Sequence, residues 1–108
     1  MSEAREIEIN ETRSFRKSLN KLSSDKHALV EDEIEKIIEA PGLGERKKGD
    51  LSHMWVHKFK IDSQEVLLAY SWVEDKMVLT LMYLGPHQNF YSDAKNRRKA
   101  DLKIIDLG

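Results

Sequence analysis

The chain has 108 residues, a formal net charge of -1 and no cysteine. A chain of this length buries a single core, and the absence of cysteine excludes disulfides and thiolate metal sites. The charged fraction of 34% is typical of a globular protein, and no apolar run approaches the ~18 residues of a membrane span. The near-neutral charge argues against indiscriminate nucleic-acid binding. We expect one cytoplasmic domain over residues 1–108, with a core at about 5–97 and no contact with a membrane.

The first forty residues predict one strand and two helices. Residues 5–9 alternate polar and apolar side chains, which is typical of a half-buried strand. Asn10 or Thr12 is suited to cap a helix that runs to about Leu22, with one apolar stripe. A second helix follows residues 23–25 and ends at residues 40–42 (APG), because proline and glycine stop a helix. The short connection predicts an antiparallel helical hairpin.

The second half of the chain predicts three strands. They cover residues 54–61, 65–73 and 77–84, and short polar turns separate them. Residues 88–99 are expected to form a last helix, and residues 100–108 a tail or edge segment. The fold class is therefore α+β, in the order strand, helix, helix, three strands and a short helix. A twisted antiparallel sheet packs against the N-terminal helical hairpin.

The histidine spacing argues against a metal site. His53 and His57 are four residues apart, but on a strand this separation is about 13 Å, which is too far to share an ion. His57 has the parity of Trp55 and Phe59, which favours a half-buried sheet residue. No metal or other cofactor is expected.

His87 is the histidine best placed for function. It follows Gly85-Pro86, a pair that ends a strand and can present the next side chain to a cleft. Tyr91 lies four residues on, so a helical turn would bring it near His87. A loop histidine that only solvates a turn is an equal alternative from this pattern alone.

Basic residues offer two further candidate surfaces. Lys58 and Lys60 share the strand face opposite Trp55 and Phe59. Such a pair is compatible with a solvated sheet surface, or with a face that holds RNA phosphates while a base stacks on Phe90 or Tyr91. The C-terminal cations add to that surface or form the solvated side of a helix; they are Lys95, Arg97, Arg98 and Lys99.

Three segments resemble the RelE/ParE superfamily of bacterial type II toxin-antitoxin toxins. They are residues 58–61 (KFKI), 67–70 (LLAY) and 84–95 (LGPHQNFYSDAK), and the last is the most specific. The resemblance covers roughly residues 5–97. It implies a small toxin that a cognate antitoxin holds inactive.

The resemblance also implies an activity. RelE-like members cut mRNA on the ribosome without a metal, through attack of a ribose 2′-hydroxyl on the adjacent phosphate. By position, His87 would protonate the leaving 5′ oxygen, Tyr91 would be the C-terminal aromatic residue, and Lys60 would orient the nucleophile and stabilise phosphate charge. The expected RNA-binding residues are Lys58, Phe90, Lys95, Arg97 and Arg98.

Two positions depart from the RelE pattern. Asp62 stands where a basic residue is common, and Leu67 stands where RelE-like toxins have a catalytic arginine. Two alternatives therefore stay open beside the nuclease. One is a ParE-like toxin that inhibits DNA gyrase without cleaving RNA. The other is an inactive relative that only binds its antitoxin.

Overall fold

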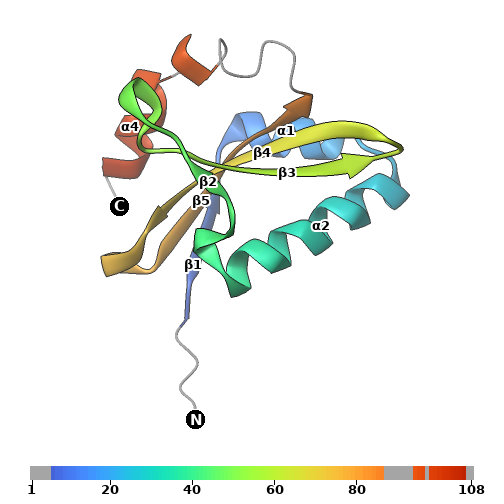
Figure 1. Cartoon of the computed structure of the whole chain (residues 1–108), viewed down its shortest axis with the longest axis horizontal. Coiled ribbons are helices and arrows are strands. Elements are labelled where there is room, and N and C mark those ends of the chain that lie inside the picture. The colour runs from blue at the N-terminus through green and yellow to red at the C-terminus, as the bar shows by residue number, and fades with distance from the viewer. Residues whose placement is uncertain (1–5, 87–93, 97, 107–108) are drawn as a thin grey trace.

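The computed structural model describes residues 6–86, 94–96 and 98–106. Its strands are β1 (Glu8–Glu11), β2 (Glu45–Arg46), β3 (Trp55–Ile61), β4 (Gln64–Val73) and β5 (Val78–Pro86). Its helices are α1 (Arg13–Asn20), α2 (Ser24–Glu39) and α4 (Arg98–Asp106). Short 3₁₀ turns cover Pro41–Leu43, Gly49–Leu51 and Glu74–Lys76. Figure 1 shows the helices arranged around one sheet. The α+β class predicted from the sequence is confirmed.

The five strands form one sheet in the order β1-β5-β4-β3-β2. Neighbours from β5 to β2 are antiparallel, as predicted for the three long strands. β1 extends the sheet in parallel to β5, which the sequence analysis did not anticipate. The connection after β1 contains both N-terminal helices and is long enough for the crossover that a parallel pair needs.

Side-chain caps define both N-terminal helices. The Thr12 hydroxyl accepts a hydrogen bond from the Phe15 backbone N–H and donates one to the Met82 carbonyl on β5. Thr12 thus starts α1 and ties it to the sheet. Ser23 caps α2 in the same way through the Lys26 N–H. Capping explains why the predicted starts are close to the observed ones.

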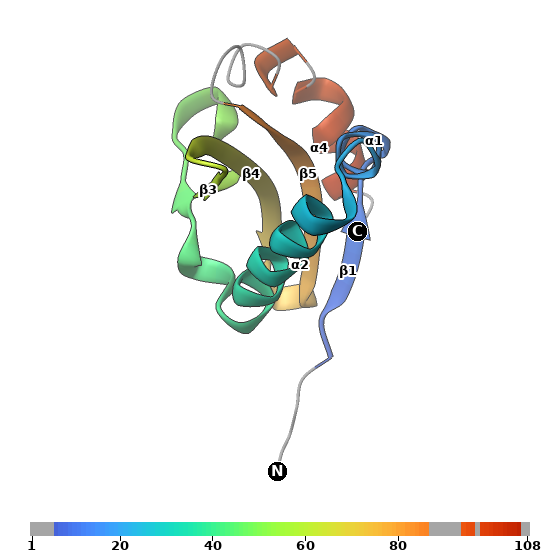
Figure 2. The ribbon, with the colours of Figure 1, turned by 90° about the vertical axis from the view of Figure 1, so that its right-hand side faces the viewer.

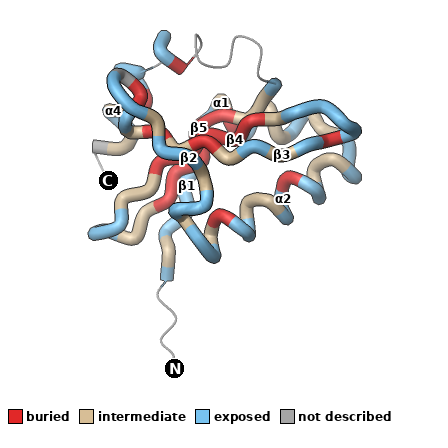
Figure 3. Tube along the Cα trace, viewed as in Figure 1, coloured by how far each residue is buried: buried red, intermediate tan, exposed pale blue. Residues whose placement is uncertain are grey.

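The sheet separates two hydrophobic cores. One lies between the sheet and α1 and α2, and it includes Phe15, Val30 and Ile37. The other lies on the opposite face under the C-terminal segment, where Ile105 packs. Figure 2 shows α2 inside the arch of β3, β4 and β5, with α4 outside it. Figure 3 shows buried residues concentrated along β4 and β5 and exposed ones at the hairpin ends.

The β3–β4 hairpin turns on two residues, Asp62 and Ser63. Both have positive φ, 51° and 70°, as a two-residue type I′ turn requires. This tight turn fixes the register and sets Lys60 opposite Glu65, and Lys58 opposite Leu67. The turn therefore determines which residues of β4 are the cross-strand partners of Lys58 and Lys60.

Tyr70 anchors the segment after α2. Its hydroxyl donates to the Pro41 carbonyl at 2.6 Å and accepts from the Gly44 N–H at 2.9 Å. A Cβ atom at Gly44 would lie 2.8 Å from that hydroxyl oxygen and 2.9 Å from the Val56 carbonyl oxygen. Glycine is therefore required where this loop crosses β3 and β4.

The C-terminal segment corrects the expected tail. Residues 98–106 form α4, whereas residues 100–108 were expected to be a tail or edge segment. Tertiary contacts hold the helix in place, because buried Asp101 accepts a 2.8 Å hydrogen bond from the Tyr83 hydroxyl and Ile105 packs on the core. Of the helix expected at 88–99, residues 94–96 and 98–99 are helical, and the rest lies outside the described residues. No helix of the described segments is long and apolar enough to span a membrane.

Candidate functional site

Lys58 and Lys60 lie on the sheet face opposite α1 and α2. On the same strand, Trp55 and Phe59 point into the core of the N-terminal helices, while Val56 is buried on the other face. Strand alternation places both lysines on the side of Val56. Both are exposed, and within the described part of the chain neither forms a salt bridge. The two ammonium groups therefore remain available to an anion.

The strand register places this lysine face beside the exit of β5. Lys58 is opposite Leu67, which is opposite Gly85 on β5. Lys60 is opposite Glu65, one residue before Val66, and Val66 pairs with Pro86. The lysines and the end of β5 thus belong to the same end of the sheet. His87 is the next residue in the sequence.

The C-terminal segment borders the same face. Ala94 is buried in the same core as Val56 and Leu67, and Ile105 packs against it. Lys95 and Arg98 are exposed on the helical residues that follow Ala94. Lys95 and Arg98 therefore belong to the segment that packs on the same face of the sheet as Lys58 and Lys60.

Half of the predicted site falls outside the described residues. These residues are His87, Phe90, Tyr91 and Arg97. Their predicted roles stay predictions.

The two departures from the RelE pattern occupy different environments. Leu67 has no exposed surface and lies in the centre of the sheet, so it contributes to the core. Asp62 is exposed at the tip of the hairpin, where its carboxylate lies 3.4 Å from the Lys26 ammonium of α2. Asp62 is therefore engaged on the helix side of the sheet and does not oppose the lysine face.

Glu65 is a potential site residue that the sequence analysis missed. It is exposed and is the cross-strand partner of Lys60. Directly opposed residues have Cβ atoms about 5 Å apart, so this carboxylate and the Lys60 ammonium can act on one ligand. Recognising the two-residue turn at Asp62-Ser63 would have revealed the pair.

Two other histidines, His57 and His53, are half-buried in the fold. Half-buried His57, as predicted, lies in the sheet, and its Nε2 donates to a Glu33 carboxylate oxygen of α2 at 2.7 Å. His53 lies near Asp101 and Arg98 of α4, and among the described residues its buried Nε2 has no hydrogen-bond partner. Burial lowers the pKa of His53, the Asp101 charge opposes that change, and the Arg98 charge adds to it. Among the described residues no cluster of side chains is suited to a metal ion.

The His57–Glu33 pair predicts a pH-dependent stability. Burial alone would raise the pKa of Glu33, but hydrogen bonds and charge from His57 and Lys36 outweigh it, and the net shift is downward. The stabilisation is therefore complete above the unfolded-state pKa and is lost as pH falls through the folded-state value, below 4.5. We expect Glu33→Gln to cost about 1 kcal/mol near pH 7. In urea unfolding, the difference from wild type should shrink as the pH falls to roughly 3; a difference independent of pH would contradict this.

Comparison with known proteins identifies the family. Residues 9–95 match the model of the family described as ParE-like toxin of type II bacterial toxin-antitoxin system. A search of curated proteins found no match. Because the family model covers most of the chain, the protein belongs to the ParE-like toxins of type II toxin-antitoxin systems.

Solved structures show the same fold. The E. coli RelE toxin in the intact RelBE toxin-antitoxin complex has 18% sequence identity and a TM-score of 0.62, covering 77% of this chain and 99% of that one. A doubly substituted E. coli RelE in the free state has 20% identity and a TM-score of 0.65, covering 84% and 96%. The isolated E. coli RelE toxin has 20% identity and a TM-score of 0.60, covering 85% and 98%. The chain therefore combines membership of the ParE-like family with a RelE-like fold.

Proposed function

We propose that this toxin is a metal-independent endoribonuclease that cleaves mRNA on the ribosome and so inhibits translation. The observation that carries the proposal is the exposed pair Lys58 and Lys60, which lies beside the end of β5 and forms no salt bridge within the described residues. Two such cations are suited to bind an RNA phosphate and the extra charge of its transition state. The site of action would be the cytoplasm, and the reaction needs no cofactor.

The proposed reaction is an internal transfer of the phosphoryl group. The ribose 2′-oxygen bonds to the adjacent phosphorus, the bond from phosphorus to the 5′ oxygen breaks, and a 2′,3′-cyclic phosphate results. Lys60 orients the nucleophile and stabilises phosphate charge. His87 donates its proton to the departing 5′ oxygen, since an imidazole near pKa 6.5 does so at neutral pH.

The proton of the 2′-hydroxyl also needs an acceptor. We assign it to the Glu65 carboxylate, because this group is opposite Lys60 on the neighbouring strand. Tyr91 and Phe90 are proposed to stack on the bases. Lys58, Lys95, Arg97 and Arg98 are proposed to bind the RNA backbone.

An antitoxin is the proposed protein partner. The E. coli RelE toxin, which shares the fold, is known in complexes with its antitoxin RelB or a peptide of it. We propose that a cognate antitoxin likewise holds this chain inactive. Failure of the chain to co-purify with the product of a neighbouring reading frame would count against this pairing.

A gyrase inhibitor is the second candidate. Buried Leu67, in place of the expected arginine, removes one cation that RelE-like cleavage uses, and the matching family is described as ParE-like. On this alternative the lysine face would bind gyrase without chemistry of its own. An inactive relative that only binds its antitoxin would show neither effect.

Expressing the chain without an antitoxin separates these candidates. We expect growth arrest with new mRNA 5′ ends inside coding regions and no increase in DNA breaks. The double variant Lys58→Ala/Lys60→Ala should lose at least ~10²-fold in cleavage, whereas Lys48→Ala, an exposed lysine of the loop after β2, should remain toxic. DNA breaks with intact mRNA would favour the gyrase inhibitor and overturn the proposal.

A further inference from the structure

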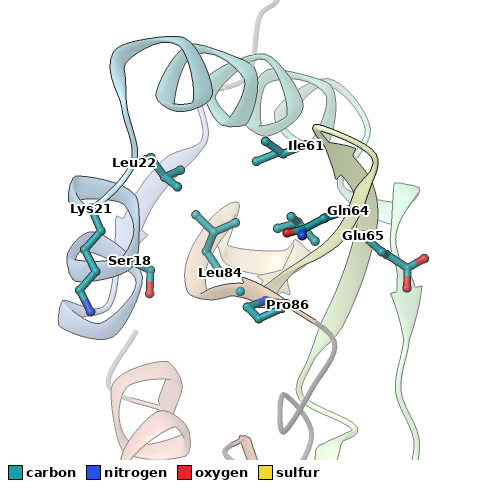
Figure 4. Close-up of a pocket in the computed structure, with 10 residues that line it drawn as sticks. Ser18, Lys21, Leu22, Ile61, Gln64, Glu65, Leu84 and Pro86 are labelled. Atoms are coloured by element: carbon teal, nitrogen blue, oxygen red, sulfur yellow. The ribbon is translucent and has the colours of Figure 1, made fainter.

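A groove lies on the helix side of the sheet, and one end of it reaches Glu65 and the end of β5. One pocket of this groove has a volume of about 300 Å³ and lies between α1, the β3–β4 hairpin and the end of β5. Figure 4 shows Leu22, Ile61 and Leu84 pointing into it, with Ser18 at the edge. A second depression of about 260 Å³ shares Leu22, Ile61 and Val66 with the first, so the two are continuous. The groove is therefore elongated and its floor is aliphatic.

A basic stripe leads into one end of this groove. Arg13, Lys17 and Lys21 follow each other at intervals of four residues along α1 and its C-cap, so they lie on one helix face. They surround a shallow depression of about 300 Å³ that shares Ser18 and Lys21 with the apolar pocket. Among the described residues, no carboxylate lines this depression.

The three cations of the stripe have no anionic partner in the described part of the chain. None forms a salt bridge there, whereas Arg16 on the same helix binds Glu11 at 2.8 Å. At the other end of the groove, Lys26 and Asp62 neutralise each other. The groove thus combines an apolar floor with positive charge at the α1 end, while the Glu65 carboxylate stands at the edge near β4.

The walls of the groove favour a protein over RNA as its occupant. The stripe is suited to phosphates or carboxylates alike. However, the described residues that line the apolar part include no aromatic side chain, and single-stranded bases are bound mainly by stacking on aromatic rings. A branched or aromatic side chain of a partner protein fits an aliphatic pocket of this size.

We infer that this groove binds an acidic segment of a partner protein, which places carboxylates along Arg13, Lys17 and Lys21 and inserts one bulky apolar side chain among Leu22, Ile61 and Leu84. The inference deepens the proposed pairing with an antitoxin and rests on it. The apolar pocket also reaches Glu65 and Pro86, so a bound segment would extend to the edge of the proposed nuclease site.

The two parts of the groove make different contributions. Burying a Leu or Phe side chain is worth about 1.5–3 kcal/mol, which corresponds to a factor of ten or more in affinity. Each exposed ion pair is worth less and weakens with salt. The apolar anchor is therefore expected to dominate affinity, and the stripe to select acidic partners.

Selection of short random peptides on the full chain tests the inference directly. The enriched peptides should be acidic and share one bulky apolar residue, and their affinities are then measured by fluorescence anisotropy. Ser18→Phe, which fills the mouth of the pocket, should weaken binding at least ~10-fold. Lys17→Glu, at a fully solvated position, should weaken it and reduce its salt dependence.

Matched variants on the same helix serve as controls. Asn20→Phe adds the same ring, and Arg16→Glu the same change of charge as Lys17→Glu, at positions that line neither the pocket nor the stripe. Both should bind the peptides like wild type. Peptides that are basic or uncharged, or that bind Ser18→Phe unchanged, would overturn the inference. A random RNA pool is tested in the same way. If RNA binding is lost in Ser18→Phe while peptide binding is kept, the inference is also overturned.

Failure of this inference is distinguishable from failure of the proposed function. The peptides are selected on the isolated chain, so their binding does not require nuclease activity. If acidic peptides bind the groove but no antitoxin co-purifies with the chain, the proposed antitoxin partner is wrong, whereas the proposed peptide-binding groove is supported. If an antitoxin co-purifies equally with wild type and Ser18→Phe, the antitoxin binds elsewhere. The proposed role of the groove is then wrong, whereas the proposed antitoxin partner is supported.

Discussion

Replacing His87 by alanine should lower mRNA cleavage by roughly 10²–10⁴-fold, the usual contribution of a general acid. The proposed reaction expels a 5′ alkoxide, which is a poor leaving group unless it is protonated as the bond breaks. The measurement is the rate at which new mRNA 5′ ends appear on programmed ribosomes under single-turnover conditions. Growth of cells that express the variant should recover accordingly.

His27→Ala is the matched control for this variant. His27 lies on α2, on the helix side of the sheet, and its Nδ1 is 3.6 Å from a Glu31 carboxylate oxygen. It should keep full activity, and both variants should melt within a few degrees of wild type. If His87→Ala cleaves mRNA at the wild-type rate, the assignment of the general acid is wrong.

Leu67→Ala should produce the largest loss of stability among these variants. Leu67 is fully buried at the centre of the sheet, between β3 and β5. Removing three heavy atoms from such a position costs about 2–5 kcal/mol, because the lost burial is added to the cavity left behind. For a domain of this size each kcal/mol lowers the melting temperature by roughly 4–8 °C.

The neighbouring Lys58→Ala provides the comparison. Lys58 is directly opposite Leu67 on β3 but is exposed, so its loss should change stability by about 0.5 kcal/mol or less. Thermal unfolding followed by circular dichroism measures both. A Leu67→Ala variant as stable as Lys58→Ala would show that the centre of the sheet is less tightly packed than the structure indicates.

Much of the fold was predictable because local signals and tertiary contacts agree. The caps at Thr12 and Ser23 define helix starts through side-chain hydrogen bonds that depend only on nearby residues. Alternation along β3 correctly separated Lys58 and Lys60 from Trp55 and Phe59. The face of the predicted lysine pair could therefore be read from parity alone.

The features that were missed depend on residues far apart in the sequence. Residues 100–108 were expected to be a tail or edge segment, but the Tyr83 hydroxyl, 18 residues before Asp101, makes burial of this carboxylate favourable and helps hold α4 on the sheet. Glu65 became a site residue only when the hairpin register was known. The parallel pairing of β1 with β5 likewise joins segments about 70 residues apart.

Only the basic part of the groove on the helix side could be predicted from the sequence. The basic face of α1 can be recognised from the spacing of Arg13 and Lys17. Its apolar continuation combines Leu22 after α1 with Ile61 and Leu84 from two strands. Such a surface exists only after the helices pack on the sheet.

Mapping RNA ends on purified ribosomes tests the central claim most directly. Ribosomes programmed with a defined mRNA are incubated with the wild-type chain or with Lys58→Ala/Lys60→Ala. The account predicts cuts within the ribosome-bound codons that leave 2′,3′-cyclic phosphate ends with wild type, and almost none with the double variant. Intact mRNA with an active wild-type toxin, or equal cleavage by both proteins, would contradict it.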